Sequence, residues 1–309
     1  MKLLRGEAVS GMNDRTCVTI GKFDGIHRGH RHLIENTIAT AVSEDLKSCL
    51  FTFDSMPDSI TGPDYKVLTS WEEKEIIFEK LGLDIVVEYP FSDSFRDLMP
   101  EEFVKSILVD KLNMKALVVG SDFIFGRDNL GTVRTLEEMS DKYGFKLFIV
   151  QKEEYEDVEI SSSRIKAALQ SGDLIEANRM LGYEYIISGV TRSGNKLGRT
   201  IGVPTMNIYP DQDKLLPAYG VYAGTAIFRG RDYSCVVNIG VRPTVDDVGR
   251  VSVETNLLDY IPEETETYDE ELTVRFLYRI RPEIKFGSME ELFIQIEKDV
   301  EEAKILLAK

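Results

Sequence analysis

The sequence contains three histidines, and all of them lie within six consecutive positions. His27 and His30 are separated by Arg28 and Gly29, and glycines also stand at positions 21 and 25. Glycine lets the backbone turn tightly and approach a ligand closely, and a helix that starts beyond such a loop offers free N–H groups to an anion. Two imidazoles at that point can donate hydrogen bonds to phosphate oxygens as charge develops in a transition state. The loop therefore predicts attack on an α-phosphate without a covalent intermediate.

The alternative is that these histidines are ordinary loop and helix-start residues. The His-x-Gly-His spacing of His27 and His30, with an apolar run before it and an amphipathic segment after it, favours the phosphate site. His32 lies outside this spacing, so we assign it to an exposed position on the helix.

A second hydroxyl-rich segment occupies residues 161–163 and is followed by Arg164 and Lys166. The first turn of a helix leaves N–H groups unsatisfied, and serine hydroxyls with a cation one turn later complete a cradle for phosphate. We interpret this segment as the site of the β- and γ-phosphates of a nucleotide. The alternative is that the serines only cap the helix.

Thr205 and Asn207 form a third candidate, within a Pro-Thr-x-Asn sequence. Residues two apart on an extended chain point to the same side, and hydroxyl and amide oxygens are hard ligands suited to Mg²⁺ beside ATP phosphates. Ordinary turn chemistry is the alternative. A glycine-spaced basic segment precedes them and is flexible enough to close over phosphates. Its candidate residues are Gly194, Lys196, Gly198 and Arg199, and it lacks the G-x-x-x-x-G-K-[ST] pattern of a P-loop.

The elements that must position the histidines alternate between short apolar runs and amphipathic segments of helical period. The runs occupy residues 17–20, 49–53, 84–89, 116–120 and 145–150. Near-continuous apolar runs are typical of strands buried on both faces, and their alternation with helices predicts a doubly wound parallel sheet. Ligands of such sheets bind outside the carboxyl ends of the strands.

The second half of the chain has a different pattern. From Tyr185 onward, five short alternating runs are separated by Gly, Pro and Asp, which predicts an antiparallel β-barrel. Ser288 and Glu291 form a capping box that starts a final helix. The 309 residues thus predict two domains, 1–184 and 185–309.

Composition excludes several classes of protein. With 37 basic and 53 acidic residues the formal net charge is −16, which argues against a general nucleic-acid binder. The three cysteines are too scattered for a disulfide framework or a zinc site. No segment has the length of a membrane span or the pattern of a signal peptide. We therefore expect a soluble protein of the reducing cytoplasm.

Residues 21–30 resemble the nucleotidyltransferase motif of the bacterial bifunctional riboflavin kinase/FAD synthetase family. Residues 51–57, 119–126 and 160–166 resemble three further motifs of that family, in the same order. The resemblance implies that His27 and His30 are catalytic. It assigns ATP and phosphate binding to Gly21, Phe23, Asp24, Gly29, Asp122, Ser162, Ser163, Arg164 and Lys166.

Several positions depart from the family's motifs. Ser55 and Met56 stand where the family has proline and histidine, and Ser163 and Lys166 replace threonine and arginine. Lysine keeps the charge but loses the bidentate fork, so contacts to pyrophosphate are expected to weaken or to pass to Arg164. These departures support an alternative, a riboflavin kinase or flavin-binding protein with a weakened or lost adenylyltransferase.

Residues 220–223, 238–244, 253–255 and 281–286 resemble the riboflavin kinase module of the same family. The resemblance implies that Thr205 and Asn207 serve the metal and the phosphates. It also implies that Glu254 is the general base that takes the proton of the riboflavin 5′-hydroxyl. Read alone, Glu254 would be an exposed strand carboxylate. Asn256 stands where the family has a histidine.

The two resemblances together imply two reactions. Riboflavin and ATP give FMN and ADP in the C-terminal domain, and FMN and ATP give FAD and pyrophosphate in the N-terminal domain, with Mg²⁺ as cofactor. The expected partners are riboflavin, FMN and ATP, without nucleic acid or membrane. A further alternative is another nucleotidyltransferase or a class I aminoacyl-tRNA synthetase. The synthetase needs a KMSKS-like loop, which the sequence lacks. Neither alternative accounts for the second half of the chain. Oligomeric state and the contacts of the flavin ring are left open.

Overall fold

The computed structural model describes residues 1–6, 11–54, 62, 64–156, 158–192, 204–241, 251–260 and 269–308. The chain divides into two compact units, Met1–Tyr65 with Lys74–Ser161 and Lys66–Glu73 with Ser162–Lys309. The sequence places the boundary at residue 184, whereas compactness divides the chain after Ser161. Two helices, α7 (Ser162–Ser171) and α8 (Leu174–Leu181), therefore group with the second unit.

The first unit is built on a six-stranded sheet in the order β1-β4-β3-β2-β5-β8, and every pair of neighbours is parallel. The strands are β1 (Lys2–Arg5), β2 (Thr16–Ile20), β3 (Lys47–Phe53), β4 (Ile85–Tyr89), β5 (Met114–Gly120) and β8 (Lys146–Val150). The five apolar runs of the sequence all form strands, which confirms the predicted doubly wound sheet. β1, at the edge, was not expected from the sequence. The strand order reverses beside β2, which is where such sheets bind ligands.

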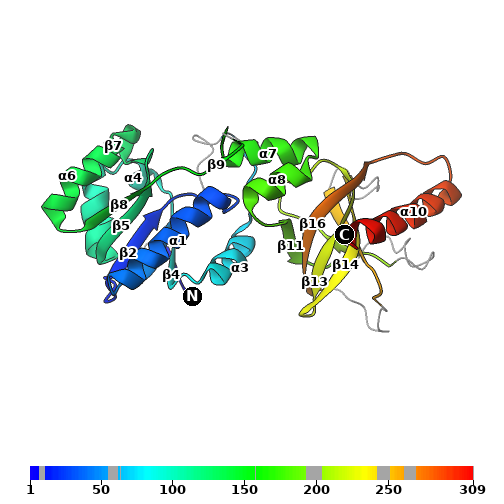
Figure 1. Cartoon of the computed structure of the whole chain (residues 1–309), viewed down its shortest axis with the longest axis horizontal. Helices are drawn as coiled ribbons and strands as arrows, with labels where there is room; N and C mark the ends of the chain where they lie inside the picture. The colour runs from blue at the N-terminus through cyan, green and yellow to red at the C-terminus, as the bar shows by residue number, and fades with distance from the viewer. Residues whose placement is uncertain are drawn as a thin grey trace. The chain divides into compact units, whose positions relative to one another are not determined.

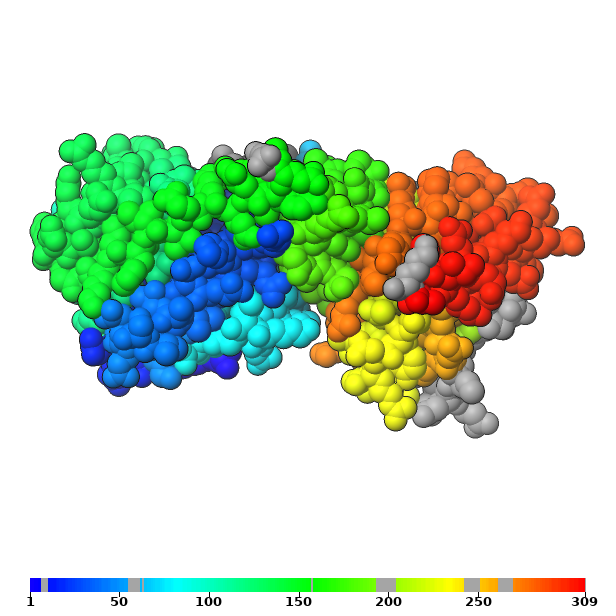
Figure 2. All heavy atoms as spheres, in the orientation of Figure 1, coloured from blue at the N-terminus to red at the C-terminus, as the bar shows by residue number. Residues whose placement is uncertain are grey.

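Helices cover both faces of this sheet. α1 (Arg28–Ser43) crosses β2, β3 and β5 on the face that carries Cys17, Ala116 and Val118 (Figure 1). η1 (Phe103–Lys111) and α6 (Val133–Tyr143) pack on the other face, around Val18 and Leu117. The outer side of α1 remains at the surface and is drawn in blue in Figure 2.

Short elements complete the first unit at the ends of the strands. They are α4 (Asp93–Arg96), α5 (Pro100–Glu102), η2 (Arg127–Asn129), β6 (Ile124–Phe125), β7 (Gly131–Thr132), β9 (Glu154–Tyr155) and β10 (Val158–Glu159). β6 and β7 form a two-stranded hairpin just after β5. This hairpin lies beyond the carboxyl end of a central strand, so it contributes to the region where a ligand is expected.

The helix starts agree with the capping signals of the sequence. The Ser70 N–H donates to Glu73 Oε2 at 2.8 Å, and the Glu73 N–H donates to Ser70 Oγ at 3.3 Å, at the start of α3 (Trp71–Leu81). Pro100 occupies the first position of α5. The side chains of Asp173 and Ser288 cap α8 and α10 (Met289–Leu307). These starts are fixed locally, which is why the sequence predicts them.

The second unit is built on a six-stranded antiparallel sheet in the order β11-β16-β13-β14-β15-β12. The strands are β11 (Tyr185–Val190), β12 (Met206–Ile208), β13 (Gly220–Phe228), β14 (Arg231–Val241), β15 (Val251–Leu257) and β16 (Glu271–Pro282). A bridge between Arg192 and Asn207 joins the two edges, so the sheet curls toward the predicted barrel. β13 turns into β14 at Arg229 and Gly230, whose φ values of 50° and 72° are typical of a type I′ turn.

The two faces of this sheet have different partners. Val237, Ile239 and Val253 alternate toward the interior and are fully buried. The residues between them face outward, and α10 lies over that outer side of β13, β14 and β16 (Figure 1). The helix is amphipathic, and its opposite side forms part of the red surface in Figure 2. A cavity lies between α10 and this outer face.

Candidate active sites

The loop that carries the histidines joins β2 to α1 and contains a strained backbone. Phe23, Gly25 and Ile26 have φ values of 48°, 81° and 38°. For residues other than glycine this costs on the order of 1–3 kcal/mol, unless the surroundings impose the conformation. The side chains of Phe23 and Ile26 are fully buried, and Phe23 packs edge-on against Phe78 with ring centroids 6.3 Å apart. Burial of these side chains therefore holds the turn that presents the histidines.

The two histidines lie against each other at the start of α1. Their rings stack with centroids 3.7 Å apart and an interplanar angle of 19°. His27 is the N-cap residue, and its Nδ1 accepts the N–H of His30 at 3.4 Å. With Nδ1 as acceptor, the neutral His27 ring carries its proton on Nε2 and can donate it to a ligand. A Cβ at Gly29 would stand 3.4 Å from the His27 ring, in ordinary van der Waals contact.

Both histidines are neutral near pH 7 in the unliganded protein. Burial lowers the pKa of His27 to about 4, against the opposing effect of the Asp24 and Glu159 carboxylates. Burial, and then the neighbouring His27 and Lys74, hold the pKa of His30 well below its usual value. In the described part of the chain, His30 Nδ1 is buried without a hydrogen-bond partner. The pair thus offers hydrogen bonds to an anion without a fixed positive charge.

The other predicted residues of this site fall in two places. Gly21, Phe23, Asp24 and Gly29 share the loop with the histidines. Asp24 is buried and accepts a hydrogen bond from the Tyr65 hydroxyl at 3.3 Å. Asp122 follows β5 with a 63% exposed side chain, and Lys152 Nζ lies 2.7 Å from it. Asp122 is therefore held at the surface by an ion pair. Ser55 and Met56 lie outside the described residues.

An aromatic cavity of about 520 Å³ opens at the carboxyl ends of the parallel strands. Its wall includes Gly21 and Lys22 from the histidine loop and Gly126 from the hairpin. Six phenylalanines line it: Phe53, Phe91, Phe95, Phe103, Phe123 and Phe125. Their rings contact one another, as in the stacked pair Phe123 and Phe125 with centroids 5.5 Å apart. The cavity suits a flat aromatic ligand, because its faces can stack on such rings.

This cavity was not predicted from the sequence, although a signal was present. Phe53 ends β3, Phe91 stands two residues after β4, and Phe123 stands three residues after β5. Aromatic residues that follow several parallel strands must gather at one edge of the sheet. Gly126 shapes the far wall, because its φ is +72° and a Cβ there would come within 2.9 Å of Pro100.

The predicted phosphate cradle begins α7, within the second compact unit. Ser162 and Ser163 occupy its first turn. The Arg164 guanidinium lies 2.8 Å from Glu176 Oε1 on α8, with both side chains about three quarters buried at 26% and 24% exposure. Arg164 therefore ties the two helices together. Lys166 is half-buried on the same helix.

The predicted kinase residues come together on the outer face of the antiparallel sheet. Asn207 on β12 pairs with Glu254 on β15, and Glu254 pairs with Asn238 on β14. Residues paired directly across antiparallel strands have Cβ atoms about 4.5–5.5 Å apart, so the carboxylate stands in a row between two amides. Ser252 Oγ donates to Glu254 Oε1 at 3.4 Å. Asn238 is a site residue that the sequence did not single out.

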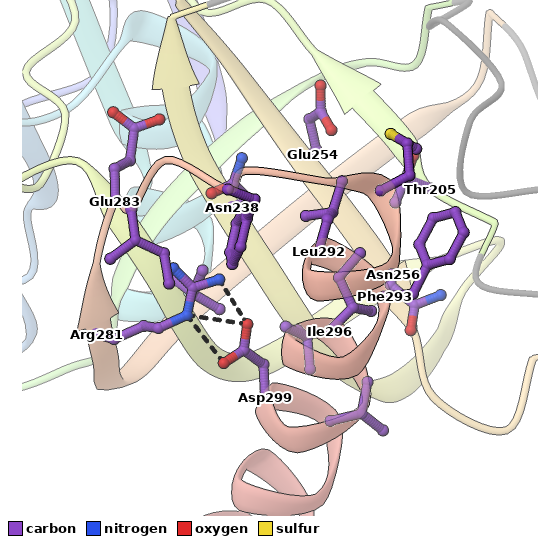
Figure 3. A pocket seen from close by; sticks show the side chains of 16 residues that line it. Thr205, Asn238, Glu254, Asn256, Arg281, Glu283, Leu292, Phe293, Ile296 and Asp299 are labelled. Atoms are coloured by element: carbon purple, nitrogen blue, oxygen red, sulfur yellow. Dashed lines mark hydrogen bonds and ion pairs between the residues drawn. The ribbon is translucent and has the colours of Figure 1, made fainter. Parts of the chain in front are cut away.

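A cavity of about 360 Å³ separates this row from α10 (Figure 3). Its polar wall comes from Thr205, Glu254 and Asn238. Its apolar wall comes from Met289, Leu292, Phe293, Ile296 and Val300 of α10, and from Val221, Val236, Ile284 and Phe286. One side therefore suits an apolar ring, and the other suits hydroxyl and phosphate groups.

A buried ion pair closes one end of this cavity. Arg281 Nε donates to Asp299 Oδ1 at 2.9 Å and Arg281 Nη2 donates to Oδ2 at 2.7 Å (Figure 3). The side chains are 18% and 4% exposed. Gln295 Nε2 also donates to Asp299 Oδ1 at 2.9 Å. The pair fastens α10 to β16 across the wall of the cavity.

The oxygen donors around Glu254 fit a magnesium–nucleotide site. Thr205 supplies a hydroxyl, Asn207 an amide oxygen and Glu254 a carboxylate, which are hard ligands. Within the described ranges, no group of three or more His, Cys, Asp or Glu residues could hold a metal by itself. Gly194, Lys196, Gly198 and Arg199 lie outside the described residues.

Comparisons with known proteins identify the families to which the two parts of the chain are similar. The family described as FAD synthetase matches residues 10–164, and the family described as riboflavin kinase matches residues 181–307. The bifunctional riboflavin kinase/FMN adenylyltransferase of Listeria monocytogenes is 35% identical over 295 residues, covering 94% of this chain and 92% of the relative. The protein of the same name from Escherichia coli K12 is 35% identical over 304 residues, covering 97% and 96%.

A solved structure matches the whole chain as well. It is a crystal structure described as a macrolide-efflux protein from Streptococcus pneumoniae, with a TM-score of 0.86 and 29% identity over 98% of this chain and 99% of that one. Among the residues described for the present chain, no helix is both long and apolar enough to cross a membrane.

Proposed function

This chain belongs to the bifunctional riboflavin kinase/FMN adenylyltransferase family, and we propose that its two parts divide the family's two reactions between them. The second part phosphorylates riboflavin with ATP to FMN, and the first adenylates FMN with ATP to FAD and pyrophosphate. The proposed functional domains remain 1–184 and 185–309, and the family matches cover residues 10–164 and 181–307. ATP, riboflavin and FMN are the proposed small-molecule partners. A cytoplasmic location is also proposed, supported by three free, buried cysteines.

In the kinase half, Glu254 is the proposed general base. The paired row of Asn207, Glu254 and Asn238, in which Glu254 and Asn238 line the cavity, carries this assignment. A carboxylate there can take the proton of a hydroxyl that attacks the γ-phosphate, while the amides orient neighbouring oxygens. Mg²⁺ held by Thr205, Asn207 and the phosphates would stabilise the charge of the transferring group.

The flavin ring of riboflavin fits the apolar half of the same cavity. Leu292, Phe293 and Ile296 supply the surface on which the ring would lie. The ribityl chain would then lead toward Glu254, because the polar groups lie on the opposite wall (Figure 3). This orientation brings the terminal hydroxyl, and not the ring, to the base.

In the adenylyltransferase half, His27 and His30 are the proposed donors to the α-phosphate. They are neutral before ATP binds, and the phosphate anion favours their protonated forms once it is bound. Hydrogen bonds that strengthen as charge develops lower the barrier to attack by the FMN phosphate oxygen. Cys17 lies near the amino end of β2, away from the histidine loop, and burial raises the pKa of its thiol to about 12, so a thiolate nucleophile is disfavoured. The proposed reaction is therefore a direct attack of the FMN phosphate on the α-phosphate of ATP.

The aromatic cavity beside the histidine loop is the proposed flavin site of this half. It shares Gly21 and Lys22 with the loop, so a ring stacked among the phenylalanines would hold its phosphate near the histidines. Ser162, Ser163, Arg164 and Lys166 remain the proposed cradle for the β- and γ-phosphates. Gly194, Lys196, Gly198 and Arg199 remain the proposed phosphate loop of the kinase.

Product analysis tests both halves. The purified protein is incubated with ATP and Mg²⁺, starting from riboflavin in one reaction and from FMN in another, and the flavins are separated by chromatography. We expect FMN and then FAD in the first reaction, and FAD in the second. Absence of FMN would contradict the kinase assignment. Tight FMN binding without FAD formation would instead favour a weakened adenylyltransferase.

A further inference from the structure

Asn256 makes a hydrogen bond that has no role in the proposed kinase reaction. Its Nδ2 donates to the carbonyl oxygen of Pro204 at 2.8 Å. The side chain is 9% exposed and lies on the same outer face as Glu254, two residues along β15. It also lines the cavity beneath α10. The hydrogen bond therefore joins the strand of the proposed base to the residue that precedes Thr205.

The segment that receives this bond lies just outside the sheet. The β12–β15 ladder begins with Met206 opposite Thr255, so Pro204 and Thr205 precede the first paired residue. Asn207 is fixed by the ladder, and its carbonyl also accepts the Arg192 N–H at 2.8 Å. Thr205 has no such position in the ladder and is exposed. The side-chain hydrogen bond at Pro204 therefore holds the residue next to Thr205.

We propose that Asn256 is a positioning residue of the kinase site, holding Pro204 so that the Thr205 hydroxyl faces the metal–nucleotide position beside Glu254. This inference rests on the proposed kinase function. The hydrogen bond to the partly buried Pro204 carbonyl fixes one atom of the segment that precedes the first paired residue of β12. Its effect is expected on binding of Mg·nucleotide, because Asn256 acts through Thr205.

The hydrogen bond to Pro204 restricts which residues can replace Asn256. Pro204 offers only a carbonyl acceptor, so the side chain at position 256 must be a donor that reaches it. Leucine has nearly the shape of asparagine but no donor. Histidine has a ring N–H at a similar reach and stands here in the motif of the resembling family. Histidine should therefore substitute for asparagine, and leucine should not.

The test measures FMN formation with Mg·ATP varied at saturating riboflavin, together with calorimetric titration of Mg·ADP in the absence of turnover. For Asn256→Leu we expect the KM for Mg·ATP and the Kd for Mg·ADP to rise about tenfold, while the KM for riboflavin changes less than about twofold. Asn256→His is expected to stay within about threefold of wild type in all three constants.

The matched control is Asn36→Leu, which removes an amide donor to the His32 carbonyl at the same 2.8 Å distance on α1. If Asn256→Leu does not fold, as judged by thermal unfolding, Asn256→Ser tests the same loss because its hydroxyl is too short to reach Pro204. Unchanged Mg·ADP affinity in a folded variant, or an equal loss of riboflavin affinity, would overturn the role of Asn256. A wild-type protein that forms no FMN would instead overturn the kinase function itself.

Discussion

The two sites are built on different kinds of backbone. The histidine site lies in a loop after a parallel strand, where Phe23 and Ile26 adopt positive φ and are held by burial. The kinase site lies on regular antiparallel strands, where Asn207, Glu254 and Asn238 occupy paired positions. A strained loop brings backbone N–H groups and rings close to a phosphate. Paired strands instead fix a base at a set distance from a cavity wall.

The sites also differ in their charge. Burial keeps His27 and His30 neutral, so the first site supplies hydrogen bonds that gain strength only when an anion is present. The second site contains a carboxylate among neutral oxygens, which suits proton removal beside a shared cation. A protein with a net charge of −16 therefore attracts its nucleotide through local groups in two unlike ways.

The largest effect is expected when the proposed base Glu254 is removed, which should impair one site and leave the other active. Glu254→Gln is expected to lower the kcat for FMN formation by about 10²–10⁴-fold, because an amide cannot take a proton. FAD formation from supplied FMN should be unchanged. Steady-state assays from each flavin measure both values. Glu271→Gln, at an exposed strand carboxylate, is the matched control. A Glu254 variant that keeps more than a tenth of wild-type activity would assign the proton to another group.

The converse experiment removes a histidine. His30→Ala is expected to lower FAD formation from FMN by about 10²–10³-fold, since a preorganised donor to the phosphate is lost. FMN formation from riboflavin should remain intact, and His32→Ala should affect neither activity. Loss of both activities in a folded His30 variant would contradict the independence of the sites.

The buried ion pair of Arg281 and Asp299 is expected to contribute to the stability of the second unit. Asp299→Ala leaves the Arg281 guanidinium without its partner and is expected to destabilise the second unit by about 3 kcal/mol. Urea unfolding measures this change. Glu301→Ala removes an exposed pair with Lys304 and should cost less than about 1 kcal/mol. Equal effects of the two substitutions would show that the buried pair does not fasten α10.

The smallest expected effect is a pH dependence of the first unit. The pKa of His27 is lowered by burial to about 4 in the folded state, from 6.5 when exposed. Between these values the unfolded chain binds more protons, so stability falls as pH decreases through this window. For this one group the loss from pH 7 to pH 5 is about 2 kcal/mol.

Urea titrations at the two pH values measure this loss. His27→Asn, which keeps a side chain suited to the N-cap, should reduce the pH dependence, and His32→Asn should leave it unchanged. An unaltered slope in His27→Asn would show that the ring is protonated in the folded protein.

Much of the fold could be predicted because its signals are local. The apolar runs of the parallel sheet, the Ser70 and Ser288 caps and the alternating strands of the barrel are each set by neighbouring residues. β1 was missed because four partly exposed residues at a sheet edge carry little pattern. The histidine loop was predicted for the same local reason, since its glycines and histidines lie within ten positions.

The parts of the sites that were not predicted depend on contacts between distant segments. The aromatic cavity needs three loops to meet at one edge of the sheet. The Asn256 bond spans 52 positions and depends on the register of β12 against β15. The pair of Arg281 and Asp299 depends on how α10 docks. Such contacts are decided by tertiary packing, which periodicity does not encode.

Mixing the two inactive variants tests the central claim most directly. His30→Ala should convert riboflavin to FMN but not to FAD, and Glu254→Gln should convert FMN to FAD but not riboflavin to FMN. Chromatography of a mixture supplied with riboflavin, ATP and Mg²⁺ is expected to show FMN first and FAD after it, although neither variant alone makes FAD from riboflavin. A mixture of folded variants that accumulates FMN without FAD, or forms neither, would contradict two independent sites in one chain.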